Sequence, residues 1–137
     1  GQLLIKGKSP VEDVAAKFAR YEHNMMYMPI IDILKPKGQA LFAEYRDKGI
    51  TPLAYEVCWS ECTPEVKECM DKVVASGSKL WVNSLWPTLN GGLCDDAAFE
   101  GDPAEVYGKL VDMGATMIQT DRPELLISYL RSRGLHD

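Results

Sequence analysis

The chain has 137 residues, of which 46% are hydrophobic, and a formal net charge of −5. This length and apolar content are typical of one globular domain with a single core, so we expect residues 1–137 to form one domain. The acidic charge, without a cluster of lysine and arginine, argues against a nucleic-acid or membrane-surface function.

The sequence carries no signal for a membrane span or a zinc site. No apolar run approaches the roughly 18 residues that a span needs, and the N-terminus lacks the residue order of a signal peptide. We therefore expect a soluble chain, and the sequence does not indicate whether it is cytoplasmic or exported. The four cysteines have no C-x-x-C spacing, and His23 and His136 lie far from them, so no metal site is predicted.

Apolar runs alternate with helix signals from the start of the chain. The first run, residues 3–5, is followed by Ser9 and Pro10, a helix-start signature, and then by apolar residues at helical spacing. The second run, residues 25–31, is apolar except for Pro29, as expected of a strand covered on both faces. Pro29 cannot donate a ladder hydrogen bond, so we expect it near the strand end or at a bulge.

Three more units of the same kind follow. Their apolar runs, at residues 53–57, 80–83 and 116–120, each lead to a proline that begins a helical stripe, and a glycine follows each stripe. Five strands with a helix after each predict an α/β fold built on a parallel sheet.

Two architectures fit this alternation: an open doubly wound sheet, or part of a (β/α)8 barrel. The Gly-rich phosphate loop of a dinucleotide-binding fold does not follow the first strand, because residues 6–10 contain one glycine. The residue pattern leaves the two architectures open. In both, functional groups gather where strands end and helices begin, so polar residues at those points are the candidates for a site.

Lys6 and Glu56 are the charged candidates. Lys6 ends the first run, where an ammonium group could hold a phosphate or a carboxylate, or could simply reach water while its stem covers apolar surface. Glu56 interrupts an apolar run, and a carboxylate there needs a partner or solvent. A metal ligand, a general base, an ion pair with Lys6 and a solvent-facing edge residue all fit.

Trp81 and Asn83 alternate onto one face of the fourth strand. If that face lines the mouth of the sheet, the indole offers a platform and the amide an orienting hydrogen bond; otherwise Trp81 is core and Asn83 a turn residue.

The long connection at residues 87–101 is expected to be a solvated acidic loop, of the length typical of a lid. Asp121 is predicted to cap the last helix.

Two stretches resemble a known family. Residues 114–123, GATMIQTDRP, resemble the terminal G-x-x-x-I-x-T-D-x-P signature of glycerophosphodiester phosphodiesterases, and residues 80–83, LWVN, are similar to that family's penultimate W-T-x-N strand. Leu80 stands where the family has tryptophan, with Trp81 one place later. The likeness is close over residues 79–136 and looser over residues 3–59.

The resemblance implies a (β/α)8 barrel that uses calcium or magnesium and hydrolyses glycerophosphodiesters to an alcohol and glycerol 3-phosphate. The family's His-Arg-Gly and His-Asp motifs are not in this sequence, and neither His23 nor His136 matches them. The chain corresponds to the C-terminal half of such a barrel, or a little more. Asn83 then matches the family's asparagine, Thr120 and Asp121 its T-D, and Pro123 its proline.

From this resemblance we expect substrate-binding residues in this chain but no catalytic residue, metal ligand or cofactor. The expected set is Lys6, Glu56, Trp81 and Asn83, and the chain alone is predicted to be inactive. Half a barrel would expose strand edges and apolar interior side chains, so we expect a partner: a second copy, or a missing N-terminal half. A non-catalytic half-barrel that self-assembles as a binding or structural module is the alternative.

Overall fold

Strands and helices alternate along the chain. The computed structural model describes residues 3–18 and 25–137. Its strands are β1 (Leu3–Gly7), β2 (Met25–Asp32), β3 (Ala54–Cys58), β4 (Lys79–Asn83) and β5 (Met117–Gln119). Its α-helices are α1 (Val11–Phe18), α2 (Pro36–Asp47), α3 (Pro64–Ala75), α4 (Asp95–Glu100), α5 (Lys109–Asp112) and α6 (Pro123–Ser132). None of the helices within the described ranges has the length and apolar character needed to cross a membrane.

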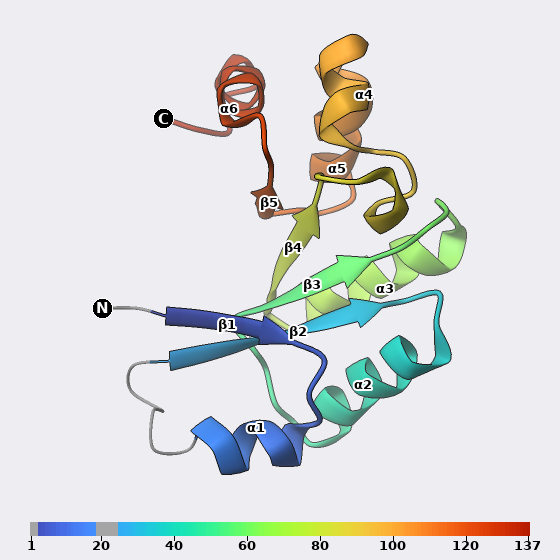
Figure 1. Ribbon diagram of the computed structural model, residues 1–137, viewed down its shortest axis with the longest axis vertical. Coiled ribbons are helices and arrows are strands. Elements are labelled where there is room, and N and C mark those ends of the chain that lie inside the picture. The colour runs from blue at the N-terminus through green and yellow to red at the C-terminus, as the bar shows by residue number, and fades with distance from the viewer. Residues whose placement is uncertain (1–2, 19–24) are drawn as a thin grey trace.

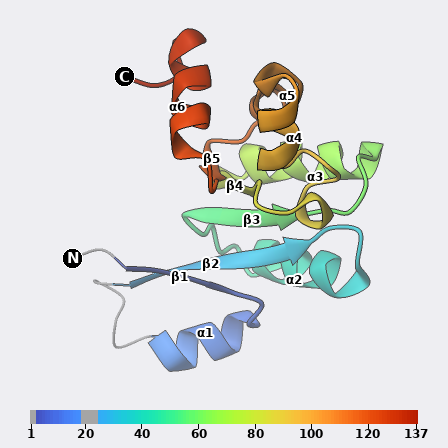
Figure 2. The same cartoon turned by 45° about the horizontal axis from the view of Figure 1, so that its top comes forward.

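The five strands form one curled parallel sheet. Their order in the sheet is β1-β2-β3-β4-β5, the same as their order in the sequence, and every pairing is parallel. The sheet curls into half a barrel, with helices packed around its convex side (Figures 1 and 2). The predicted α/β fold of about five parallel βα units, a partial TIM barrel, is therefore confirmed.

The core lies between the convex face of the sheet and the helices. Tyr55 of β3 meets two rings of α2 edge-on, with centroid distances of 5.2 Å to Phe42 and 6.2 Å to Tyr45. Burial raises the pKa of Tyr55 to about 12. Because residues alternate along a strand, the neighbouring Glu56 points to the opposite, concave face. All five residues of β3 are nonetheless buried.

Strand β2 extends beyond its neighbour β1. The pairing of β1 with β2 ends at Gly7 and Pro29, whereas residues 30–32 of β2 pair with β3. Pro29 thus lies where the ladder with β1 stops, as expected for a residue without an N–H. Beyond this point, the β1 side of residues 30–32 has no strand partner among the described residues.

The connection after β4 is more ordered than predicted. It contains a 3₁₀ turn, Pro87–Leu89, and α4. The backbone of Trp59, just after β3, donates to the Leu89 carbonyl at 3.1 Å and accepts from the Gly91 N–H at 2.9 Å. The prediction of a solvated loop was wrong here, because part of the segment adds an isolated bridge to the end of the sheet. A π-helical turn, Ala104–Gly108, then leads into α5.

Candidate functional site

Side chains from four strands meet on the concave face of the sheet. Alternate residues of a strand share a face, and the register places Glu56 beside Trp81, and Asn83 beside Gln119. Lys6 of β1 reaches the same group. We call Lys6, Glu56, Trp81, Asn83 and Gln119 the mouth cluster. The structure brings together the four residues that the sequence selected as a substrate-binding set, and it adds Gln119.

Lys6 neutralises the buried carboxylate of the cluster. Glu56 is 3% exposed, and its Oε2 lies 2.9 Å from Lys6 Nζ. This oxygen has no aligned hydrogen bond within the described residues, so the contact is an ion pair. A buried carboxylate is costly without a cation. Of the alternatives for Glu56, the structure shows the ion pair with Lys6, and the solvent-facing reading was wrong.

The remaining members of the cluster surround this pair. Lys6 Nζ also donates to Gln119 Oε1 at 2.8 Å and lies 5.5 Å from the centre of the Trp81 ring. Asn83 Nδ2 lies 3.4 Å from both Glu56 Oε1 and Gln119 Oε1, which makes two long, weak hydrogen bonds. The Trp81 Nε1 atom is buried and has no hydrogen-bond partner among the described residues. It is therefore a donor that an acceptor on a ligand could satisfy.

The cluster has the chemistry of a binding site. It offers one ion pair, two amides and an aromatic face with a free N–H, a set that suits a small polar molecule with hydroxyl groups. Cys58, two residues after Glu56, is not an activated nucleophile: burial, then Glu56 and Asp32, raise its pKa to about 12, so the thiol stays protonated at neutral pH.

The residues for metal or acid–base chemistry are not gathered here. In residues 3–18 and 25–137, no three His, Cys, Asp or Glu side chains are placed to hold a metal ion together. His136 is exposed at the C-terminal tail, where its Nδ1 lies 2.7 Å from the Asp137 carbonyl. His23 lies outside the described residues.

Asp121 does not cap the last helix, contrary to prediction. Helix α6 starts at Pro123, and Arg122 is its N-cap; the described residues supply no side-chain cap hydrogen bond there. Asp121 instead donates its backbone N–H to Asp95 Oδ2 at 2.7 Å. Asp121 lies one residue before the N-cap position, which Arg122 occupies with a non-helical backbone, φ −122° and ψ 61°.

Asp95 is a buried structural centre that the sequence did not reveal. It is 3% exposed, and its Oδ1 accepts from the Ser84 hydroxyl at 2.6 Å and the Tyr107 hydroxyl at 3.0 Å. Together with the Asp121 N–H, these donors tie the segments just after β4 and β5 to α4 and to the π-helical turn that carries Tyr107. Burial is the main cause that raises the pKa of Tyr107 to about 12, so Tyr107 is a donor at neutral pH.

Gln119 could have been found from the sequence. It interrupts an apolar strand at the carboxyl end, as Glu56 does, and it lies two residues after Met117 on the same face. Asp95 had no comparable signal, since it lies in an acidic stretch beside Asp96 and follows no apolar run. Asp95 is buried and Asp96 is not because α4 packs against the end of β4 with Asp95 on the inner side.

Comparisons with known proteins give one family. A search of the curated proteins found no match. A family model described as a domain of unknown function, DUF4996, matches residues 27–130, which include Glu56, Trp81, Asn83 and Gln119 but not Lys6. Since this match spans most of the chain, the protein belongs to the DUF4996 family.

Proposed function

We propose that this chain is the C-terminal part of a barrel of the glycerophosphodiester phosphodiesterase type, a phosphoric diester hydrolase of glycerophospholipid metabolism. The mouth cluster would form one wall of the substrate pocket. The observation that carries the proposal is the meeting of Lys6, Glu56, Trp81 and Asn83, which come from three parallel strands, on the concave face of the sheet. Enzymes of this architecture hold their substrates at the carboxyl ends of such strands.

The cluster fits the polyol part of such a substrate better than its phosphate. Lys6 already contacts Glu56 and Gln119, so its charge is compensated. The amides of Asn83 and Gln119 and the Trp81 N–H can exchange hydrogen bonds with glycerol hydroxyls. The cluster holds neither a nucleophile nor an acid–base histidine in the described residues, so hydrolysis would depend on groups from outside the mouth cluster.

Activity and binding are tested separately. The purified chain is assayed with glycerophosphocholine and calcium or magnesium, and we expect no turnover above the rate without protein. Metal-dependent turnover that survives repurification contradicts the proposal that this chain is inactive alone. Binding of glycerophosphocholine is followed by NMR titration, in which we expect chemical-shift changes at the mouth cluster.

Two tryptophan variants make the binding test specific. Trp81→Leu removes the aromatic face and the N–H, and we expect it to weaken binding about tenfold, or about 1.4 kcal/mol. Trp86→Leu is the matched control, because Trp86 is 58% exposed and lies outside the cluster; its effect should stay within about twofold. An equal loss of binding affinity in the two variants would show that the mouth cluster does not form the binding site.

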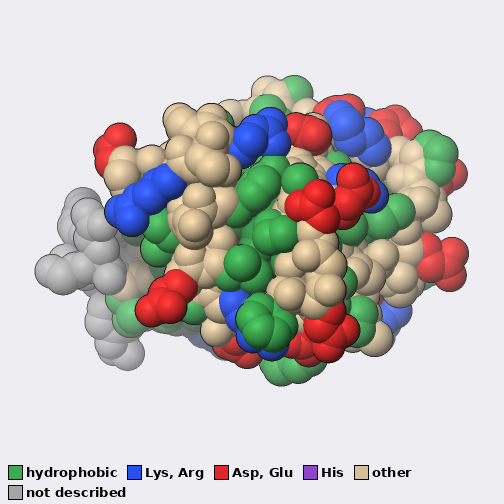
Figure 3. Space-filling view, turned by 90° about the horizontal axis from the view of Figure 1, so that it is seen from above, with side chains coloured by type: hydrophobic (Ala, Val, Ile, Leu, Met, Phe, Trp, Pro, Cys, Tyr) green, Lys and Arg blue, Asp and Glu red, His purple; other side chains and the backbone are tan. Residues whose placement is uncertain are grey.

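A second candidate is a half-barrel that assembles with itself as a binding or structural module. The observation that favours it is the open sheet: β1 pairs only with β2, and β5 only with β4, in the described chain. Beside β5 lies a largely apolar groove of about 550 Å³, lined by α6, by Ile118 of β5 and by the residues that flank β5. The space-filling view shows apolar side chains gathered in the middle of one face with charged groups around them (Figure 3).

A further inference from the structure

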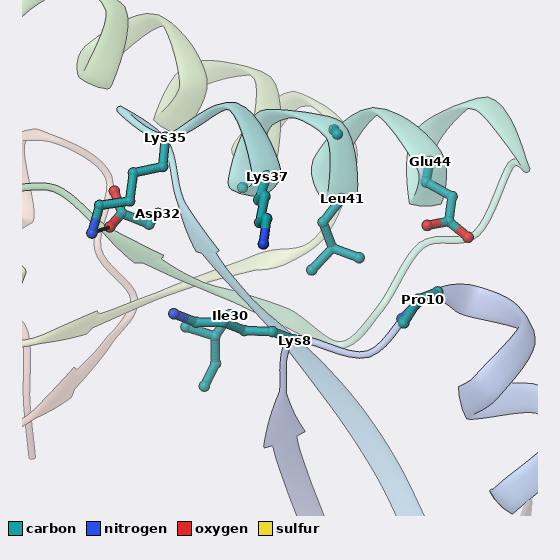
Figure 4. Close-up of a pocket in the computed structure, with 10 residues that line it drawn as sticks. Lys8, Pro10, Ile30, Asp32, Lys35, Lys37, Leu41 and Glu44 are labelled. Carbon is teal, nitrogen blue, oxygen red and sulfur yellow. Dashed lines mark ion pairs between the residues drawn. The ribbon is translucent and has the colours of Figure 1, made fainter.

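A pocket opens between α2 and the segment that follows β1, and its residue Ile30 is the neighbour in register of Glu56 in the mouth cluster. Its volume is about 400 Å³, and both apolar and charged residues line it. The apolar part comes from Pro10, Ile30 and Leu41, and the lysines are Lys8, Lys35 and Lys37 (Figure 4). The pocket exists because β2 runs past the end of β1, which leaves the β1 side of residues 30–32 uncovered by a strand in the described chain.

The close approach of α2 to β2 builds one wall. Gly38, in the first turn of α2, lies so near the end of β2 that a Cβ atom there would clash with the Asp32 carbonyl oxygen. This contact holds the first turn of α2, with Lys35 and Lys37 at its start, directly over the carboxyl end of β2. In Figure 4 the amino groups of Lys8 and Lys37 reach into the space between α2 and β2 from opposite sides.

The charges of this pocket are unbalanced. Lys35 Nζ is paired with Asp32 Oδ2 at 2.8 Å. Glu44, the other acid of the wall, accepts from the Val11 N–H at 3.1 Å and pairs with Lys48 at 3.3 Å. Lys8 and Lys37 form no ion pair or hydrogen bond with any described residue. Two uncompensated ammonium groups therefore face one cavity in a protein whose net charge is −5.

We propose that this pocket binds a phosphate-monoester dianion, held between Lys8 and Lys37, with any organic portion lying on the apolar part of the wall at Leu41. Two ammonium groups match the charge of a dianion, and lysine binds phosphate as a point charge. The same chemistry serves inorganic phosphate and phosphorylated small molecules. The apolar wall favours the phosphorylated small molecule, because inorganic phosphate has no group to cover it.

The proposal is tested by NMR titration of the whole chain with inorganic phosphate, with phenyl phosphate, which carries an apolar group, and with sodium chloride at matched ionic strength. We expect saturable shifts for the first turn of α2 and for the segment after β1, with phenyl phosphate binding at least about fivefold more tightly than phosphate. The affinity should fall as salt rises. Shifts that do not saturate, or that sodium chloride reproduces, contradict the proposal. Equal affinity for the two phosphates contradicts the role of the apolar wall at Leu41.

Lysine variants test whether Lys8 and Lys37 supply the positive charge that binds phosphate. Lys8→Gln and Lys37→Gln should each weaken phosphate binding about fivefold or more. Lys79→Gln is the matched control, since Lys79 is an exposed lysine at the opposite, amino end of the sheet; an equal loss in this control would overturn the proposal. This test is separate from the test of the proposed function. Phosphate can bind at Lys8 and Lys37 in a chain that does not bind glycerophosphocholine at Trp81, and glycerophosphocholine can bind in a chain that does not bind phosphate.

Discussion

Asp95 and Asp96 are neighbours with identical side chains, yet only Asp95 is buried. Asp95 is the first residue of α4, and its carboxylate turns inward to three donors, whereas Asp96 is exposed and pairs with Arg122 at 2.8 Å. Removing the inner carboxylate should be costly because the Tyr107 hydroxyl and the Asp121 N–H would lose an acceptor. A surface ion pair contributes little.

Removing these two carboxylates should therefore have unequal effects on stability. Asp95→Ala removes the acceptor of the Tyr107 hydroxyl and of the Asp121 N–H, while the Ser84 hydroxyl keeps the Gln119 carbonyl at 2.8 Å. We expect a loss of about 3 kcal/mol in the free energy of unfolding. Asp96→Ala should cost less than about 1 kcal/mol. Urea unfolding of both variants measures the difference, and similar losses would show that Asp95 is not a structural centre.

At the scale of elements, the sequence signals that correctly predicted where helices begin and end are local ones. Prolines at the first helical position begin α2, α3 and α6, as the sequence predicted, and Gly49 and Gly77 follow α2 and α3 with positive φ. The short α4 was missed, since its six residues have neither a proline start nor an apolar stripe long enough to indicate a helix. Its order comes from contacts with the ends of β4 and β5.

The docking of α2 on β2 can be tested at Gly38. Glycine to alanine inside a helix normally stabilises by about 1 kcal/mol. Here the added methyl group would clash with the Asp32 backbone, so we expect Gly38→Ala to lower the free energy of unfolding by about 2 kcal/mol. Lys37→Ala, at the exposed neighbouring position, should change it by less than about 0.5 kcal/mol. A stabilised Gly38→Ala protein would mean that α2 does not lie this close to β2.

At the scale of the whole molecule, the sheet is an unclosed half of a barrel. The expectation that its interior face would be apolar was only partly met, since Met28 and Trp81 share that face with Lys6, Glu56, Asn83 and Gln119. The open edge of β5, with the apolar groove beside it, is the surface that a further strand and helix would cover.

Self-assembly through this edge is a prediction for the intact chain. If two copies pair, light scattering at micromolar concentration should give a mass above that of one chain, and Ile127→Lys, which places a charge in the groove, should shift the population toward monomer. Ser128→Lys, on the exposed side of α6, is the matched control and should leave the mass unchanged. A wild-type chain that is monomeric throughout the micromolar range contradicts self-pairing.

The sequence by itself determined the five βα units and the candidate residues on their strands, because strand periodicity and helix starts depend on neighbours a few residues apart. Only the tertiary structure decided three further features. These are the curl of the sheet, the cation that pairs with Glu56, and the choice of the buried aspartate. Each depends on register between strands far apart in the chain: Lys6 and Gln119 meet across 113 positions, and no local pattern encodes that contact.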